Sequence, residues 1–266
     1  MMEFEPFLDE DAKLSGQKRS GTIQSVSIAM RFLNILAAAE RALPLAEIAQ
    51  LSRTGRSTAH RYMQSLVKEG LAVQDPVSSR YDLGPAALSL GVAALRRVDA
   101  VEISGMQMKQ LTENHGLSAG VAIWTERGPT IVRWYRSAHF AITAISLGDV
   151  LPIDNSASGL VFQAFLPRAQ TEAARRLQPN GFRGTPSGKA VLDRIRAEGW
   201  AELTSHLLSN VTGQAAPILD AQGELACVVT TAGNLGKLDS PQAGLALRDA
   251  ARLINRATGG QSTFDD

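Results

Sequence analysis

The sequence has little of what several protein classes require. Its 266 residues contain a single cysteine, Cys227, so no intramolecular disulfide can form and we expect a reducing, cytoplasmic setting. No apolar run approaches the roughly 20 residues of a membrane-spanning helix, and the acidic start of the chain is not the pattern of a secretion signal. No spacing of histidine and cysteine indicates a zinc site. We therefore expect no membrane association, no metal and no cofactor.

Charge is distributed unevenly along a chain whose net charge is only +1. Residues 1–15 carry five carboxylates against one lysine, whereas residues 16–84 carry nine cations against five carboxylates. A basic module fits a polyanionic partner, and a modest excess fits a dimer that pools two such modules. We expect residues 1–20 to form a disordered acidic tail and residues 259–266 to form a flexible one.

The most informative stretch runs from Pro44 to Gly84, where two short helices are expected at 45–51 and 56–68. The second helix has an apolar side and a side rich in cations, hydroxyls and an amide, without a carboxylate. Such a face suits phosphates and base edges. The apolar side comprises Ala59, Tyr62, Met63, Leu66 and Val67, and the polar side comprises Ser57, Arg61, Gln64 and Lys68, flanked by His60 and Ser65.

The flanking residues complete a module that we place at residues 21–84. Thr54 is expected to cap the second helix and Gly70 to end it. Two short strands around an Asp-Pro-Val-Ser-Ser turn predict a wing whose tip can touch phosphate or the minor groove. A preceding helix at about 24–39 is expected to be capped by Ser25. The pattern is that of a winged helix-turn-helix, and the alternative is a helical hairpin with a solvated cationic side.

The residues expected to contact double-stranded DNA lie on the second helix, in the turn before it, in the wing and at the start of the first helix. They are Ser25, Arg53, Arg56, Ser57, Thr58, His60, Arg61, Gln64, Lys68, Ser79 and Arg80. Arg31 is a further candidate for a phosphate contact, with an unremarkable surface role as its alternative.

The rest of the chain predicts a linker helix at 85–97 and an α+β domain at 98–258. The linker helix is apolar enough to pack against a partner subunit. The size and apolar strands of the α+β domain suit a cavity for a small molecule. Helices are expected at 98–115, 156–165, 187–198 and 241–257, and strands at 121–124, 130–135, 142–145, 214–218 and 224–231.

Four segments carry a family resemblance: Leu-Ala-Glu-Ile-Ala, Ser-Thr-Ala-His-Arg, Gly-Leu-Ala and Arg-Tyr-Asp-Leu-Gly. At this spacing they resemble the winged helix-turn-helix of the isocitrate-lyase-regulator (IclR) family of bacterial transcription regulators. Arg53 and Thr54 stand where members usually have Gly and Leu, which predicts a longer or more strained turn. The resemblance implies a GAF-like effector-binding domain, a homodimer or homotetramer, and operator binding controlled by a small carboxylate or aromatic effector.

Residues 147–160 resemble a stretch that faces the effector in this family, with Asp154 in place of the usual His and Leu160 in place of Lys. A helix that starts with small residues offers free amides to an anion, although a capped helix packed on the sheet is an equal alternative. Leu160 and Ala232 suggest a less polar, aromatic ligand, and Thr230 is expected to hydrogen-bond a carboxylate or carbonyl. The resemblance implies ligand contacts at Ser156, Ala157, Ser158, Gly159, Leu203, Gly213, Thr230 and Ala232.

The rival hypothesis is an enzyme built on the α+β domain. It needs a nucleophile beside a base, or paired acids in a cleft. Cys227 and Ser158 are the candidate nucleophiles and Asp154 is the candidate acid, but the sequence places no partner beside any of them. We therefore expect a regulator and no catalytic residues. A DNA-binding protein with a purely structural role would leave the apolar second domain unexplained.

Overall fold

The structure is a computed structural model that describes residues 23–138, 145–182, 184–205, 208–234 and 240–260. It divides into two compact units, Met1–Ala93 and Ala94–Asp266. The predicted tail at 1–20 lies outside the described residues, as do residues 261–266 and most of the strand predicted at 142–145.

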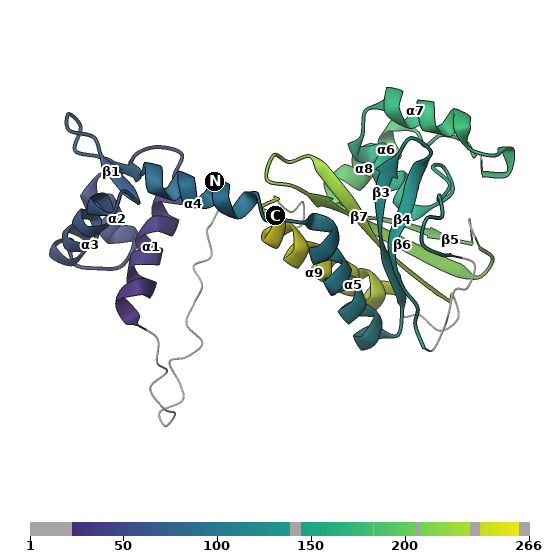
Figure 1. Cartoon of the computed structure of the whole chain (residues 1–266), viewed down its shortest axis with the longest axis horizontal. Coiled ribbons are helices and arrows are strands. Elements are labelled where there is room, and N and C mark those ends of the chain that lie inside the picture. The colour runs from purple at the N-terminus through teal and green to yellow at the C-terminus, as the bar shows by residue number, and fades with distance from the viewer. Residues whose placement is uncertain (1–22, 139–144, 183, 206–207, 235–239, 261–266) are drawn as a thin grey trace. The chain divides into compact units, whose positions relative to one another are not determined.

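The first unit is a winged helix-turn-helix, as the sequence predicts (Figure 1). Three helices pack around fully buried side chains of Phe32, Ile48 and Met63, and Tyr81 of the wing completes this core. The wing is joined to the helices by an isolated bridge between Leu43 and Tyr81. The elements are α1 (Gln24–Ala38), α2 (Leu45–Leu51), α3 (Arg56–Lys68) and the antiparallel strands β1 (Ala72–Gln74) and β2 (Tyr81–Leu83).

Two predicted helix caps are wrong. Gly55 is the residue before α3, and no side chain caps that helix. The hydroxyl of Thr54 instead pairs with that of Ser52 at 2.8 Å, which stabilises the turn rather than the first amides of α3. Ser25 lies inside the first turn of α1, whose preceding residue is Ile23. The predicted end of α3 is confirmed, because Gly70 follows it with a φ of +70° that favours glycine.

The second unit is built on an antiparallel five-stranded sheet in the order β4-β3-β7-β6-β5. The α+β class predicted from the sequence is therefore confirmed. Its strands are β3 (Ser118–Thr125), β4 (Gly128–Tyr135), β5 (Ala201–Thr204), β6 (Val211–Leu219) and β7 (Leu225–Asn234). The helices are α4 (Pro85–Leu95), which begins in the first unit, α5 (Ala100–His115), α6 (Ala157–Phe165), α7 (Arg168–Leu177), α8 (Lys189–Glu198) and α9 (Ser240–Thr258), with a 3₁₀ turn at Asn180–Phe182.

Helices cover both faces of this sheet, which explains why its central strands are apolar on both sides. Val229 of β7 packs with α5 and α9, whereas its neighbour Val228 points to the opposite face and packs with α6. Figure 1 shows α5 and α9 together on one side of the strands and α6 to α8 on the other. The start of α6 is thereby held over the middle of the sheet.

Two elements of this unit were not predicted from the sequence, β5 and α7. Strand β5 has four residues and lies at the edge of the sheet. Helix α7 buries only Thr171 and Ala174, so its inner face offers no run of large apolar residues to detect. Within the described residues, no helix is both long enough and apolar enough to cross a membrane.

Candidate functional sites

The outer face of α3 is exposed, as its sequence pattern predicts. Ala59, Met63 and Leu66 are buried on the inner side, and this fixes the rotation of the helix. Among the residues that the structure describes, Arg56, Arg61 and Lys68 form no ion pair, so these cations are available to a polyanion. The exposed residues of this helix are Arg56, Ser57, Thr58, His60, Arg61, Gln64, Ser65 and Lys68.

The turn before α3 has the strain that its sequence predicts. Arg53 is exposed and has a φ of +54°, a left-handed conformation that glycine adopts more readily. The backbone is held there because Thr54 N–H donates to the carbonyl of Ala49 at 3.1 Å. This conformation places Arg53 in the loop between α2 and α3.

The wing tip is organised by Asp75. Its carboxylate accepts hydrogen bonds from the amides of Val77 and Ser78, each at 2.7 Å, and these bonds lower the pKa of Asp75, the one from Ser78 most strongly. Ser79 is exposed with a φ of +56°. The guanidinium of Arg80 donates to the carbonyl of Ala42 at 3.1 Å, which anchors the wing and commits part of that side chain within the protein.

Helix α1 places two further candidates differently. Ser25 is exposed in the first turn of the helix. Arg31 donates to the carbonyl of Ser52 at 3.4 Å, so part of its guanidinium ties α1 to the end of α2. Its position therefore supports the structural alternative at least as well as a phosphate contact.

A cavity of about 50 Å³ lies between the start of α6 and the sheet of the second unit. Seven of the eight residues implied as ligand contacts line it: Ser156, Ala157, Ser158, Leu203, Gly213, Thr230 and Ala232. The eighth, Gly159, is not among the lining residues. A Cβ at Gly159 would overlap the carbonyl oxygens of Pro152 and Ile153, so this glycine allows α6 to pack closely on the preceding loop.

Most polar groups around this cavity already have partners. The hydroxyl of Ser156 donates to the carbonyl of Pro152 and accepts from the amide of Gly159, which confirms it as the cap of α6. The hydroxyl of Thr230 donates to the carbonyl of Gln214 at 2.8 Å. The expectation for Thr230 is therefore corrected: its proton is committed, so it can accept a hydrogen bond from a ligand but not donate one.

Two polar atoms at the cavity are buried without a partner in the described structure, Ser158 Oγ and Trp134 Nε1. Leaving a buried donor unsatisfied costs about 1–3 kcal/mol. Trp134 lies opposite Gly120 in the β3–β4 pair, and a Cβ at Gly120 would come within 2.6 Å of the indole ring. Because glycine has no side chain, Gly120 leaves space for the indole ring of Trp134.

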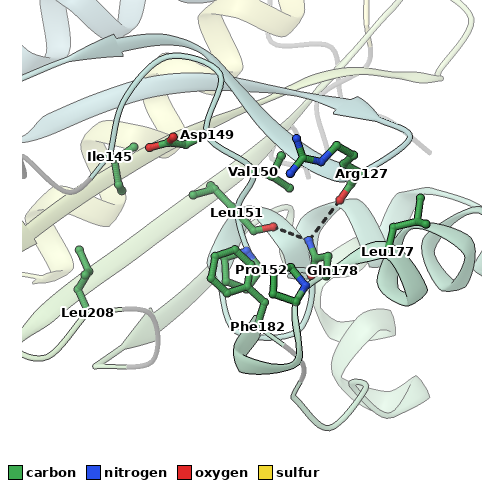
Figure 2. A pocket seen from close by; sticks show the side chains of 11 residues that line it. Arg127, Ile145, Asp149, Val150, Leu151, Pro152, Leu177, Gln178, Phe182 and Leu208 are labelled. Carbon is green, nitrogen blue, oxygen red and sulfur yellow. Dashed lines mark hydrogen bonds between the residues drawn. The ribbon is translucent and has the colours of Figure 1, made fainter.

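A larger cavity of about 380 Å³ lies beside the loop that precedes α6. Figure 2 shows Gln178 in its wall, where the side-chain amide donates to the carbonyls of Leu151 at 2.9 Å and Arg127 at 3.4 Å. Its remaining walls are mostly apolar, with Arg127 and Asp149 as the charged residues. This cavity and the smaller one share three lining residues, Ile145, Leu151 and Leu208.

Comparison with known proteins identifies both units. Residues 25–76 match the family model for the IclR helix-turn-helix domain, and residues 92–256 match the model for the bacterial transcriptional regulator IclR C-terminal domain. The chain belongs to the IclR family. Its units are therefore the DNA-binding and effector-binding domains of a transcriptional regulator.

Individual relatives agree with this assignment. The glycerol operon regulatory protein of Streptomyces griseus is 30% identical over 254 residues, which cover 89% of this chain and 97% of that protein. The crystal structure of HmgR from Pseudomonas aeruginosa is 31% identical with a TM-score of 0.78, covering 90% of this chain and 99% of HmgR. The repressor BlcR of Agrobacterium tumefaciens shares the fold at 18% identity, with a TM-score of 0.74 and coverage of 91% and 100%.

Membership of the IclR family excludes the enzyme hypothesis, and the geometry agrees. The thiol of Cys227 is buried and its burial raises its pKa to about 11, so it is protonated at neutral pH and a poor nucleophile. Ser158 Oγ has no hydrogen-bond partner among the described residues. Among the described residues, no three histidine, cysteine or acidic side chains are grouped as a metal site.

Asp154, one of the residues that depart from the IclR-family pattern, has a structural partner. The Arg175 guanidinium on α7 donates to both of its carboxylate oxygens at 2.9–3.1 Å, and the two side chains are 16% and 1% exposed. Arg175 also donates to Gln163 of α6 at 2.9 Å. This buried network joins α7, α6 and the loop before the small cavity.

Several residues of the small cavity were not predicted from the sequence. They are Trp134, Ile145, Leu151, Asn155, Leu208, Val211 and Thr231. Trp134 is the most consequential, because it contributes an unsatisfied donor. Only the pairing of β4 with β3 brings it to the face of the sheet that α6 covers.

Proposed function

We propose that this IclR-family regulator binds an inverted-repeat operator as a homodimer or homotetramer, and that a small-molecule effector in the second unit controls this binding. The observation that supports it best is the outer face of α3. Its inner side is fixed in the core, and its outer side carries exposed cations, an amide and hydroxyls. Arg61 pairs with guanine or phosphate, and Gln64 suits adenine.

The proposed DNA contacts are those expected from the sequence, ordered by their geometry. The primary contacts are Arg53 and the predicted residues of α3, because their side chains are exposed. Arg80 is a secondary contact because it also holds the carbonyl of Ala42. Ser25 and Ser79 are exposed and complete the set as phosphate contacts.

The proposal of an oligomer rests on α4. This helix buries none of its residues within the chain, although it carries several large apolar side chains. Leu88 and Leu90 are 70% and 63% exposed. An apolar helix surface of this kind is stabilised when a second copy of the chain covers it, and two copies present two α3 helices to an inverted repeat.

Relatives indicate the kind of genes that are controlled. Proteins of similar sequence include regulators of the glycerol operon in Streptomyces and the Pca regulon regulatory protein of Pseudomonas putida. We therefore place this chain at an operon of small-molecule metabolism. The effector would bind beside the start of α6 and shift the balance between DNA-competent and incompetent states.

In the decisive experiment, fragments of the source genome are incubated with the purified protein at near-physiological salt, and the fragments that stay bound are sequenced. We expect a few sites that share an inverted motif. Retention without a motif, lost smoothly as salt rises, would contradict the proposal because it indicates only phosphate binding.

Arg61→Ala tests the role of α3 at the recovered site. Loss of one base contact should weaken specific binding by about 1–3 kcal/mol. The matched control is Arg194→Ala, which removes an exposed arginine from α8 in the other unit. Fluorescence anisotropy with labelled operator measures both. Equal affinities of the Arg61 variant and the wild type would refute a recognition role for this residue.

A further inference from the structure

The two cavities of the second unit are neighbours rather than separate sites. Both cavities are lined by Ile145, Leu151 and Leu208, and no other described residue lines both. The smaller cavity has about 50 Å³ and the larger about 380 Å³. An apolar cavity of roughly 150 Å³ holds a benzene ring, so the smaller one accommodates little more than a polar head group.

The smaller cavity is chemically specific. Its described lining has no ionisable side chain, and two buried donors, Trp134 Nε1 and Ser158 Oγ, lack a partner. Ser158 is 1% exposed and stands in the first turn of α6, where backbone amides also have no helical partner. All these groups favour a hydrogen-bond acceptor and disfavour a cation.

The larger cavity offers the complementary environment. The Gln178 side chain in its wall already makes three hydrogen bonds, to the amide of Ile153 and the carbonyls of Leu151 and Arg127. Its N–H groups are therefore committed within the protein. The surrounding walls are mostly apolar and include Val150 and Phe182, with Arg127 and Asp149 as the charged residues, so they suit an apolar body.

We propose that the two cavities form one composite site for an amphipathic small molecule. Its oxygen acceptor, a carboxylate or an amide carbonyl, binds Trp134 and Ser158, and its apolar body passes Leu208 into the larger cavity. This inference rests on the proposed function, because it names the chemical class of the effector. The predicted ligand contacts included neither Trp134 nor any residue that lines the larger cavity.

The test uses the full-length protein and four probes: acetate, hexanoate, hexanamide and hexylammonium. We expect hexanoate to bind more tightly than acetate, by about fourfold for each methylene that enters the apolar cavity. Hexylammonium should not bind, because its head group donates where acceptors are required. Comparison of hexanoate with hexanamide shows whether the natural head group is charged or neutral. Failure of both to bind overturns the proposal.

The indole N–H signals in a ¹H–¹⁵N spectrum report the head group directly. Hexanoate should shift the signal of Trp134, assigned by Trp134→Phe, and leave that of Trp200 in place. Ser158→Ala should weaken hexanoate about tenfold without lowering the urea midpoint, because it removes an unsatisfied hydroxyl. An unmoved Trp134 signal at saturating hexanoate would overturn the assignment of the head-group site.

Two further variants separate the cavities. Gly213→Val should abolish binding of every probe, since a Cβ there has no other atom closer than 3.9 Å and the valine fills the smaller cavity. Leu208→Asn, at a half-buried position, should weaken hexanoate but not acetate, because it makes the passage polar without a charge that would repel either carboxylate. Equal losses for both probes would overturn the role of the larger cavity. These measurements contain no DNA, so their failure is distinct from failure to select an operator.

Discussion

The outer face of α3 and the small cavity beneath α6 both present hydrogen-bond donors without protein partners, but under opposite conditions. The donors of α3 are exposed and largely cationic, so water satisfies them until a polyanion replaces it. The cavity donors, Trp134 Nε1 and Ser158 Oγ, are buried and neutral and have no partner among the described residues, so an acceptor on a ligand can satisfy them. The first site therefore depends on salt, and the second depends on close complementarity.

The largest expected effect is a loss of stability in the unit that holds the small cavity. Asp154→Ala leaves the mostly buried Arg175 without its carboxylate and should destabilise the second unit by about 3–5 kcal/mol. Urea unfolding followed by tryptophan fluorescence measures it, because Trp124, Trp134 and Trp200 all lie in that unit. Glu172→Ala, which removes an exposed ion pair from the same α7 helix, is the control and should leave the urea midpoint nearly unchanged. Similar costs for the two variants would contradict the importance of the buried network.

Gly159→Ala should have the next largest effect. The added methyl would meet the carbonyls of Pro152 and Ile153, and we expect a loss of about 2 kcal/mol together with weaker effector binding. Gly181→Ala is the matched control, because its methyl would have no neighbouring atom within 4 Å. The same urea experiment compares them, and equal midpoints would show that α6 adjusts without cost.

The substitution Arg53→Gly tests the other site of this comparison, the DNA-binding surface. Glycine adopts the observed φ of +54° without strain, so the first unit should gain about 0.5–1 kcal/mol while DNA affinity falls. Arg53→Ala keeps the strain but removes the guanidinium, so it should lose affinity without gaining stability. Thermal unfolding and operator titration of the two variants separate the effects. A gain in stability from Arg53→Ala would argue against backbone strain.

The smallest effect concerns the wing and pH. The folded-state pKa of Asp75 is lowered from 3.8, so the ionised carboxylate stabilises the turn above that pH and this contribution is lost as pH falls through the lowered value. Because Asp75 is fully exposed, the change should be local. An NMR titration of the amides of Val77 and Ser78 should show a midpoint below 3.8, and a midpoint at or above 3.8 would refute the turn's effect.

Much of the first unit was predictable because its signals are local. The period of α3 placed Met63 in the core and Arg61 outside, and both positions are confirmed. The predicted cap at Thr54 failed because its hydroxyl pairs with that of Ser52 and Gly55 takes the position before α3. The choice of partner is decided by backbone conformation, which composition does not encode.

The second unit was predictable in class but not in detail. Strand periodicity indicated an α+β domain. Helix α7 was not predicted, because it buries few residues and is held by the ion pair between Arg175 and Asp154. The ligand residues implied by resemblance mostly reached the cavity, whereas Trp134 was not foreseen. Its place depends on which strand pairs with β3 and on the register of that pair.

The sequence by itself determined the family, the two kinds of domain and the basic outer face of α3, because these depend on spacings within single elements. The tertiary structure alone decided which donors remained free. The hydroxyl of Thr230 donates to the carbonyl of Gln214 and Asp154 is paired with Arg175, whereas Ser158 Oγ and Trp134 Nε1 have no partner among the described residues. A hydrogen bond between residues distant in sequence is fixed by strand register and helix packing, and only the folded chain brings those partners together.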